Sequence, residues 1–286
     1  MQVGTVIEIW RYPVKSMGGE ELARTAIGPL GLPGDRGWAV RDEVAGEMRG
    51  AKKFPVLLQC TARYEEEPTV ECVPPAEITF PGGDRMRSVD PRAAARLSEL
   101  LGRRVTLWPL EPPDNRDHYR RVPPDGGEME ADLRAVFGRL PDEPLPDLSV
   151  FPPELFEFTS PLGTYFDAFP LHLLTTASLR ELAGRTPGSR FDRRRFRPNV
   201  LIEPAAGATG LVETAWCGRD LRIGAVTVRV EMPCIRCSMT VQPQGDLPKD
   251  PAVLRTIVRD AEQSLGVYAR VVSAGTIAVG AAVELI

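Results

Sequence analysis

Two cysteines three residues apart, with an arginine between them, are the part of this sequence best suited to chemistry. The run reads Met232-Pro-Cys-Ile-Arg-Cys-Ser238, which places Cys234 and Cys237 on either side of Arg236. Soft metals bind thiolates, and a neighbouring guanidinium favours the thiolate over the thiol. The segment therefore predicts a thiolate that binds a metal or attacks an electrophile.

Other interpretations of this cysteine pair stay open. A tetrahedral zinc site needs a second pair, and Cys60, Cys72 and Cys217 stand singly in the sequence. A thioredoxin-like redox pair normally opens a helix after a strand in a βαβ unit, which the sequence pattern does not indicate. Two inert structural thiols are an equally simple interpretation.

A cluster of arginines lies upstream, where residues 190–199 read Arg-Phe-Asp-Arg-Arg-Arg-Phe-Arg-Pro-Asn. Arginine binds phosphate oxygens in a bidentate manner, so this segment is a candidate anion site. For most of the five arginines a solvated basic loop is the simpler interpretation. Arg197 is the exception that we favour as a ligand contact, because Phe196 and Pro198 fix it at the entrance to a predicted strand.

Two rigid turns near the N-terminus each carry a cation. Tyr12-Pro-Val-Lys-Ser16 contains Lys15, and Gly31-Leu-Pro-Gly-Asp-Arg-Gly-Trp38 contains Arg36. Turns rich in proline and glycine fix a side chain at little entropic cost. The alternatives are a surface lysine for Lys15 and, for Arg36, a salt bridge with Asp35 that holds the turn.

The composition limits the possible functions. The chain has 286 residues, 43% of them hydrophobic, and a net charge of −4, so we expect two domains and no nucleic-acid or membrane partner. Five cysteines suit reduced thiols in the cytoplasm, and the N-terminus does not resemble a signal peptide. Only two histidines are present, which excludes a His-rich metal site.

Alternating hydrophobic runs predict many short strands and few helices. A helix over 90–102 is indicated by an Asp90 cap, a following proline and a final glycine. A hairpin is expected to lead directly into Cys234. The other expected strands lie at 3–9, 37–41, 56–64, 69–73, 77–80, 104–110, 198–203, 266–273 and 276–286. The other expected helices lie at 130–137, 176–183 and 250–262.

These patterns favour a mainly β (α+β) fold with two β-barrel-like units and peripheral helices over a parallel βαβ sheet. We expect an N-terminal domain over residues 1–115 and a C-terminal domain over 116–286. Prolines crowd the segment 111–170, which we interpret as the crossing between them.

Taken together and in this order, Tyr-Pro-Val-Lys-Ser, Gly-Asp-Arg-x-Trp, Phe-Arg-Pro-Asn and Cys-x-Arg-Cys followed by Val-x-Pro strongly resemble the MOSC family. The resemblance spans nearly the whole chain. It implies an N-terminal MOSC β-barrel followed by a MOSC domain, which is pyruvate-kinase-barrel-like. It also implies a molybdenum–molybdopterin cofactor that reduces N-hydroxylated compounds such as amidoximes and hydroxylamines.

The resemblance also implies which residues form the site. The metal-bound, catalytic cysteine falls on Cys237, and Cys234 is a neighbour of it. Cofactor contacts are implied at Lys15, Ser16, Arg36, Asp167, Thr175, Thr176, Ser178, Arg197, Asn199 and Arg236.

Partners follow from the same resemblance. A small-molecule substrate is implied, and because no membrane anchor or iron–sulfur cysteine motif is present, we expect electrons from a separate donor protein with its own reductase. Ferredoxin, flavodoxin and cytochrome b5-like proteins are the candidate donors. The alternatives are a cofactor carrier or sulfur-transfer module, or a non-catalytic barrel that binds another anion such as pyridoxal phosphate, with Lys15 as the Schiff-base lysine.

Overall fold

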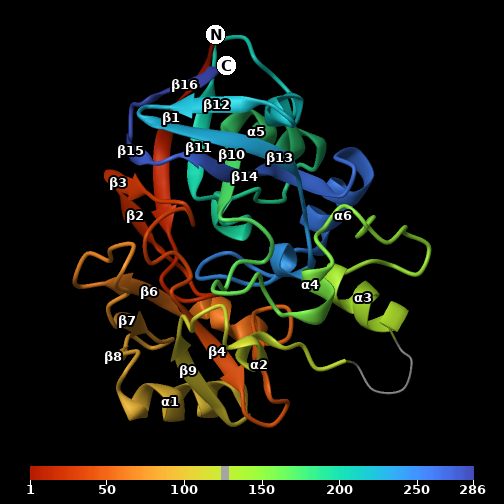
Figure 1. Cartoon of the computed structure of the whole chain (residues 1–286). Helices are drawn as coiled ribbons and strands as arrows, with labels where there is room; N and C mark the ends of the chain where they lie inside the picture. The colour runs from red at the N-terminus through yellow and green to blue at the C-terminus, as the bar shows by residue number, and fades with distance from the viewer. Residues whose placement is uncertain (124–128) are drawn as a thin grey trace.

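The computed structural model describes residues 1–123 and 129–286, and seven of its strands close into a barrel in the upper half of Figure 1. The barrel closes because β1 (Gln2–Arg11) pairs with β11 (Val200–Pro204). Its one parallel pair is β11 with β10 (Leu171–Thr175). The order is β11 (Val200–Pro204), β10 (Leu171–Thr175), β14 (Ser264–Ser273), β13 (Val226–Ile235), β12 (Asp220–Ile223), β16 (Ala282–Leu285) and β1 (Gln2–Arg11), with β2 (Glu20–Leu22) beside β1.

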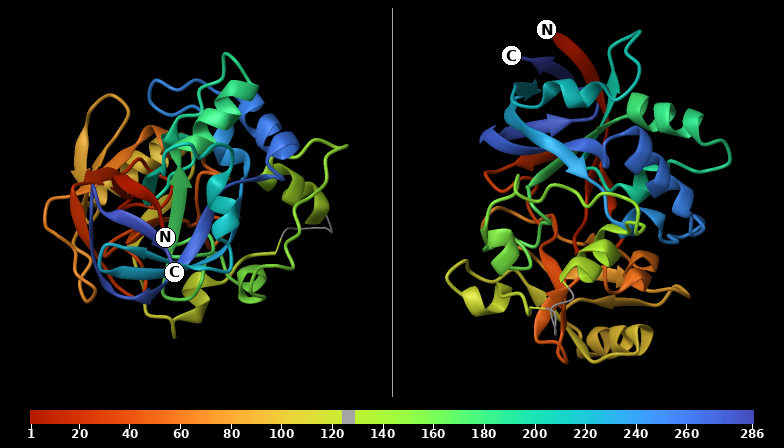
Figure 2. Two further views of the ribbon diagram at one scale, coloured as in Figure 1. Left: turned by 90° about the horizontal axis from the view of Figure 1, so that it is seen from above. Right: turned by 90° about the vertical axis from the view of Figure 1, so that its right-hand side faces the viewer.

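Branched aliphatic side chains fill the barrel. In β1 the buried residues Val6 and Ile9 both belong to the barrel core although they are three positions apart, because the pairing with β11 shifts between Val6 and Glu8. The single period-two alternation expected over residues 3–9 is therefore interrupted by a bulge. Ile202 in β11 and Val267 in β14 complete the same core. The two termini meet at one end of the barrel, where the Met1 amino group donates to the Leu285 carbonyl at 2.9 Å (Figure 2).

A second unit lies below the barrel in Figure 1 and consists of two three-stranded sheets and a helix around one apolar core. The prediction of a mainly β fold with barrel-like units is therefore confirmed. The sheets are β5 (Glu47–Arg49), β4 (Trp38–Asp42) and β9 (Val105–Pro109), and β6 (Thr61–Tyr64), β7 (Ala76–Thr79) and β8 (Arg85–Arg87), packed against α1 (Pro91–Leu101).

Strand pairing crosses the expected division at residue 115. The first strand, β1, pairs with β11 and β16 of the C-terminal barrel. In addition, β3 (Arg24–Ile27) pairs with β15 (Gly275–Ala278). The division into 1–115 and 116–286 stays a prediction about chain order, but the barrel itself needs a strand from each side of it.

The helices begin and end largely where the capping residues indicate. The Asp90 side chain accepts from Arg92 N, and Gly102 ends α1 with a φ of +60°. Two longer helices, α5 (Thr176–Arg185) and α6 (Pro251–Asp260), pack on the outside of the barrel. The 3-10 helices in the described part of the chain are η1 (Pro55–Gln59), η3 (Arg193–Arg195), η4 (Val212–Trp216) and η5 (Ser238–Val241).

Two strand predictions are wrong in part or in whole. The expected strand over 56–64 begins as the 3-10 helix η1, because Pro55 starts a local turn that Cys60 N closes by donating to Leu57 O. The expected strand over 69–73 does not form. There the Thr69 hydroxyl accepts from the backbone N–H groups of the residues two and three positions later, which replaces sheet pairing by a local turn.

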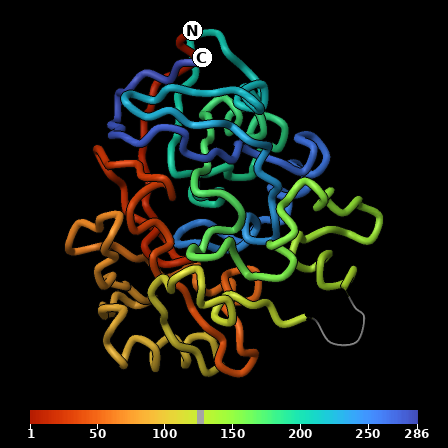
Figure 3. The backbone as a smooth tube through the Cα atoms, in the orientation of Figure 1, coloured from red at the N-terminus to blue at the C-terminus, as the bar shows by residue number. Residues whose placement is uncertain are grey.

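The expected crossing, 111–170, runs along the side of the molecule between the two units (Figure 3). It includes residues 124–128, which lie outside the described residues. It carries α2 (Arg116–Tyr119), α3 (Met129–Phe137) and α4 (Glu154–Glu157). Within the described part of the chain, no helix has the length and apolar character needed to cross a bilayer.

The barrel core predicts a large effect of one substitution. Ile202 is fully buried where β11 joins β1 and β10, so Ile202→Ala is expected to lower the free energy of unfolding by about 2–5 kcal/mol. Val272→Ala on the exposed end of β14 is the control, with a change within about 0.5 kcal/mol. Urea denaturation measures both, and equal losses would contradict this account of the core.

Candidate functional site

Three of the predicted cations converge where the barrel meets the second unit. The Arg36 and Arg197 guanidinium groups lie 5.2 and 4.1 Å from the Tyr12 ring centroid. The Lys15 ammonium lies 3.4 Å from a carboxylate oxygen of Asp167. Residues that are far apart in the sequence thus form one positively charged cluster, as a single anionic ligand would require.

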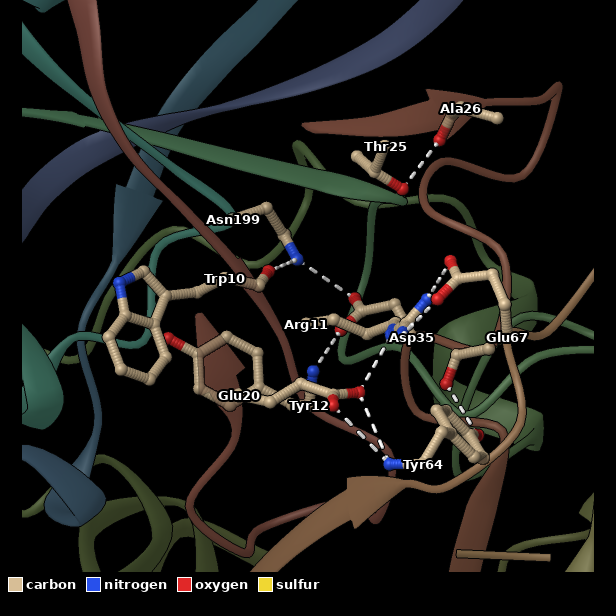
Figure 4. Close-up of polar contacts among 11 residues, drawn as sticks. Trp10, Arg11, Tyr12, Glu20, Thr25, Ala26, Asp35, Tyr64, Glu67 and Asn199 are labelled. Atoms are coloured by element: carbon tan, nitrogen blue, oxygen red, sulfur yellow. Dashed lines mark hydrogen bonds and ion pairs between the residues drawn. The ribbon is translucent and has the colours of Figure 1, made fainter. Parts of the chain in front are cut away.

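A buried carboxylate, Asp35, supports this cluster, and Figure 4 shows it bonded to Tyr12 and Asn199. It accepts hydrogen bonds from Tyr12 N at 2.8 Å and Asn199 Nδ2 at 3.0 Å, and it pairs with Arg36. The salt-bridge alternative for Arg36 is therefore present alongside its place in the cluster. The Asn199 amide also donates to Trp10 O and accepts from the protein backbone, so the structure places Asn199 as a positioning residue.

Backbone strain is concentrated around the cluster. Among the described residues, five that are not glycine have positive φ: Ser16, Arg36, Arg197, Glu262 and Gln263. Each such position costs of order 1–3 kcal/mol and persists only where surrounding contacts enforce it. Three of the five are predicted site residues, and the other two adjoin the backbone before Cys237, where Arg236 N donates to Gln263 O at 2.9 Å.

The Ser16 side chain fixes the turn that contains Gly50 and Ala51. Its hydroxyl accepts from Ala51 N at 2.8 Å, and a Cβ on Gly50 would lie only 2.5 Å from that oxygen. The turn therefore requires glycine at this point. It presents Lys52, whose ammonium lies 3.6 Å from Asp167.

Lys15 and Lys52 both pair with Asp167, but their pKa values shift in opposite directions. Burial lowers the pKa of Lys15 to about 8, with Asp167 opposing the change, whereas Asp167 raises the pKa of Lys52. Burial would raise the pKa of Asp167, but Lys52, Lys15 and Arg36 together hold it well below its usual range. The carboxylate is 46% exposed and stays ionised between its cations.

Cys237 lies at the start of η5, directly after the barrel strand β13, and is half-buried. Arg236 is buried, and its guanidinium donates to Cys234 Sγ at 2.6 Å and to Phe196 O at 2.5 Å. Burial raises the pKa of the Cys234 thiol. The arginine between the cysteines thus contacts Cys234, which leaves Cys237 as the accessible thiol of the pair.

Two further cations near Cys237, Lys52 and Arg139, were missed by the sequence analysis. Cys237 adds to the effect of Asp167 in raising the pKa of Lys52. Burial lowers the pKa of Arg139, which Glu143 and, after it, Cys237 oppose. The turn residue Gly50 beside Lys52 was the one available signal. Arg139 follows the end of α3 in the proline-rich crossing, where no pattern marks it.

Two buried donors in the cluster lack a partner within the described part of the chain. They are Arg197 Nη2 and Arg236 Nε. A buried, unpaired N–H is costly, so such donors indicate a missing acceptor. Burial and the neighbouring Arg36 together lower the pKa of Arg197 to about 10, which an anionic ligand would oppose.

Thr175, Thr176 and Ser178 belong to a different cluster. The hydroxyls of Thr175 and Ser178 donate at 2.6 Å to the buried Glu213, and Thr176 donates to Glu203. Burial raises the pKa of Glu213. These residues cap α5 and fix η4, and none of their hydrogen-bond partners belongs to the cation cluster. The structure does not bring this part of the predicted site together with the rest.

The described residues contain no group of three or more His, Cys, Asp or Glu side chains that could hold a metal ion. A metal bound at Cys237 would therefore have to bring most of its ligands with it.

Two sequence family models match this chain. The model described as the MOSC N-terminal beta barrel domain matches residues 3–96, and that described as the MOSC domain matches residues 163–284. This chain belongs to the MOSC family. The resemblance found in the four sequence motifs is thereby confirmed.

Characterised relatives of this MOSC protein are distant. Mitochondrial amidoxime reducing component 2 of Homo sapiens is 28% identical over 84% of this chain and 67% of its own length. Mitochondrial amidoxime-reducing component 1 of Mus musculus is 28% identical over 100% of this chain and 83% of its own. Among solved structures, the YUAD protein from Bacillus subtilis is 11% identical, with a TM-score of 0.44 over 99% of this chain and 95% of its own.

The electrostatics of the MOSC site predict that its two lysines titrate differently. Lys15, with a pKa of about 8, is expected to react with acetic anhydride as a neutral amine at pH 9, whereas Lys52 stays protonated. Labelling from pH 7 to 10 followed by peptide mass spectrometry measures both residues in one sample.

The lowered pKa of Lys15 also predicts how the free energy of unfolding changes with pH. The pKa of Lys15 is below its unfolded value of 10.5, so between pH 8 and 10.5 the unfolded chain binds more protons and the contribution of Lys15 to the unfolding free energy rises with pH. The variant Lys15→Met should lack this rise. A labelling midpoint for Lys15 at or above that of Lys52 would contradict the assignment.

Proposed function

We propose that this MOSC protein is a molybdenum-cofactor-dependent oxidoreductase that reduces N-hydroxylated compounds such as amidoximes and hydroxylamines. One observation carries the proposal: an accessible thiol, Cys237, adjoins a cation cluster in which two buried donors have no partner among residues 1–123 and 129–286. The names of the distant relatives, amidoxime-reducing components, support the same reaction class.

The residues present fit a molybdopterin group. Arg197 and Arg236 each offer a buried N–H donor that has no acceptor in the described part of the chain, and Arg36 and Lys15 add positive charge for a phosphate. Cys237 supplies one soft thiolate ligand, which suits a metal that arrives with a dithiolene of its own. When bound, the cofactor supplies the two-electron chemistry of the reaction.

The side chains of this protein would bind the cofactor and fix its orientation. Asp35 fixes the positions of Arg36 and Tyr12, and Asp167 pairs with both Lys15 and Lys52. In the overall reaction, an N-hydroxylated substrate gains two electrons and two protons and loses its hydroxyl oxygen as water. The electrons come, we propose, from a separate donor protein of the ferredoxin, flavodoxin or cytochrome b5-like type in the cytoplasm.

The test is benzamidoxime reduction by purified protein made in a host that synthesises the cofactor, with a chemical reductant as electron source. Cys237→Ala is expected to lose both turnover and bound molybdenum while keeping the melting temperature of the cofactor-free wild type, because it removes the metal ligand from a half-buried position.

Cys72→Ala is the matched control, since this exposed thiol lies outside the cluster and its loss should leave both quantities unchanged. Full turnover in Cys237→Ala, or wild-type protein without molybdenum, would sink the proposal.

A second candidate, a barrel that binds pyridoxal phosphate, is favoured by one observation. Burial lowers the pKa of Lys15 to about 8, so a useful fraction of its amine is neutral at physiological pH and available to attack an aldehyde. An aldimine absorbance band should then appear with pyridoxal phosphate, vanish in Lys15→Arg and persist in Cys237→Ala. Absence of the band in the wild type rejects this candidate.

A further inference from the structure

Arg139 is an arginine from the crossing segment that reaches the candidate site. Its residue is only 6% exposed, although no residue of the preceding helix α3 is buried. Gly138 makes the turn between them with a φ of +62°, and a Cβ there would lie 3.3 Å from Ser238 Cα. The chain therefore passes directly against the residue that follows Cys237.

The Arg139 guanidinium binds three groups. It donates to Arg236 O at 3.1 Å, to Gln263 Oε1 at 2.8 Å and to Phe137 O at 2.5 Å. The first acceptor is the carbonyl of the residue immediately before Cys237. The second belongs to a residue with a φ of +66°, in the turn that leads into β14.

These contacts occur where the sheet no longer fixes the backbone. The last pair between β13 and β14 is Ile235 with Ser264. After this last pair, Arg236 N donates to Gln263 O at 2.9 Å. The Arg139 guanidinium binds the same two residues, through the Arg236 carbonyl and the Gln263 side chain. The backbone that leads into Cys237 is thus held between the strained turn and one side chain from outside the barrel.

We propose that Arg139 is a positioning residue that fixes the backbone at Cys237 so that its thiolate is presented to the cofactor. This inference rests on the proposed function. Arg139 lies between the two matched family regions, 3–96 and 163–284, so the crossing segment supplies a part of the site that neither region contains.

The charge of Arg139 needs its own explanation, because burying a guanidinium is costly and a neutral amide donor could bind the same carbonyl. The cost is offset where an anion lies close by. Glu143 is the first such group, and Cys237, when ionised, adds its charge to that effect on Arg139. A planar fork with several donors also fixes two acceptors at once, which a lysine ammonium does with less directional control.

The matched control is Arg255, which anchors the same crossing segment. It binds Glu143 and the Gly138 carbonyl, and neither partner belongs to the loop 234–241. Arg139→Met and Arg255→Met therefore both loosen the segment, whereas Arg139→Met alone frees the carbonyl before Cys237. Arg139→Lys keeps the charge and loses the fork.

The first measurement is hydrogen exchange by mass spectrometry on the full chain purified without cofactor. In Arg139→Met, amides in peptide 234–241 are expected to exchange about tenfold faster than in the wild type, which corresponds to the loss of one charge-assisted hydrogen bond. Arg139→Lys should be intermediate, and Arg255→Met should match the wild type in this peptide.

The second measurement is molybdenum per chain after expression in a cofactor-competent host, with the same expected order of variants. Equal results for Arg139→Met and Arg255→Met in both measurements overturn the proposal. If Arg139→Met does not fold, Arg139→Lys is compared with Arg255→Met by the same criterion. Retention of molybdenum by Cys237→Ala would instead refute the proposed function, while the exchange result on cofactor-free protein still decides the role of Arg139.

Discussion

The candidate site depends on one buried carboxylate, Asp35, that joins three distant segments. It accepts from Tyr12 at the end of the first strand and from Asn199 at the start of β11, and it pairs with Arg36 on its own turn. A buried carboxylate is stable only when its oxygens are hydrogen-bonded and its charge is compensated. That requirement brings the turn and the two barrel strands together, and the site cations with them.

Positive charge then accumulates beyond what Asp35 can balance. Arg36 and Arg197 share the Tyr12 ring, and Lys15 and Lys52 share a single partly exposed carboxylate, Asp167. The excess appears as a lowered pKa at Lys15 and Arg197, which burial causes and neighbouring cations reinforce. A protein that keeps such a cluster, on backbone held in left-handed conformations, is prepared for an anion.

The barrel and the second unit both contribute residues to the candidate site. The barrel supplies Cys237 at the end of β13, where sheet pairing stops and the side chain can face outward. The second unit supplies Lys15 and Lys52 on turns fixed by Ser16 and Gly50. The crossing segment adds Arg139 against the cysteine loop. No single stretch of the chain contains the site, which explains why both family regions and the segment between them are needed.

The sequence by itself determined the local features: the strand periodicity, the Asp90 and Gly102 ends of α1, and the motifs that place Lys15, Arg36, Arg197 and Cys237 on rigid turns and strand ends. These follow from short-range sterics and capping, which act over a few residues. Only the tertiary structure decided that β1 joins the C-terminal barrel, that Arg236 contacts Cys234, that the Thr175 group caps a helix with Glu213, and that Lys52 and Arg139 lie beside Cys237. Those outcomes rest on contacts between residues up to about 280 positions apart. They also rest on the compensation of buried charge, and local sequence patterns encode neither.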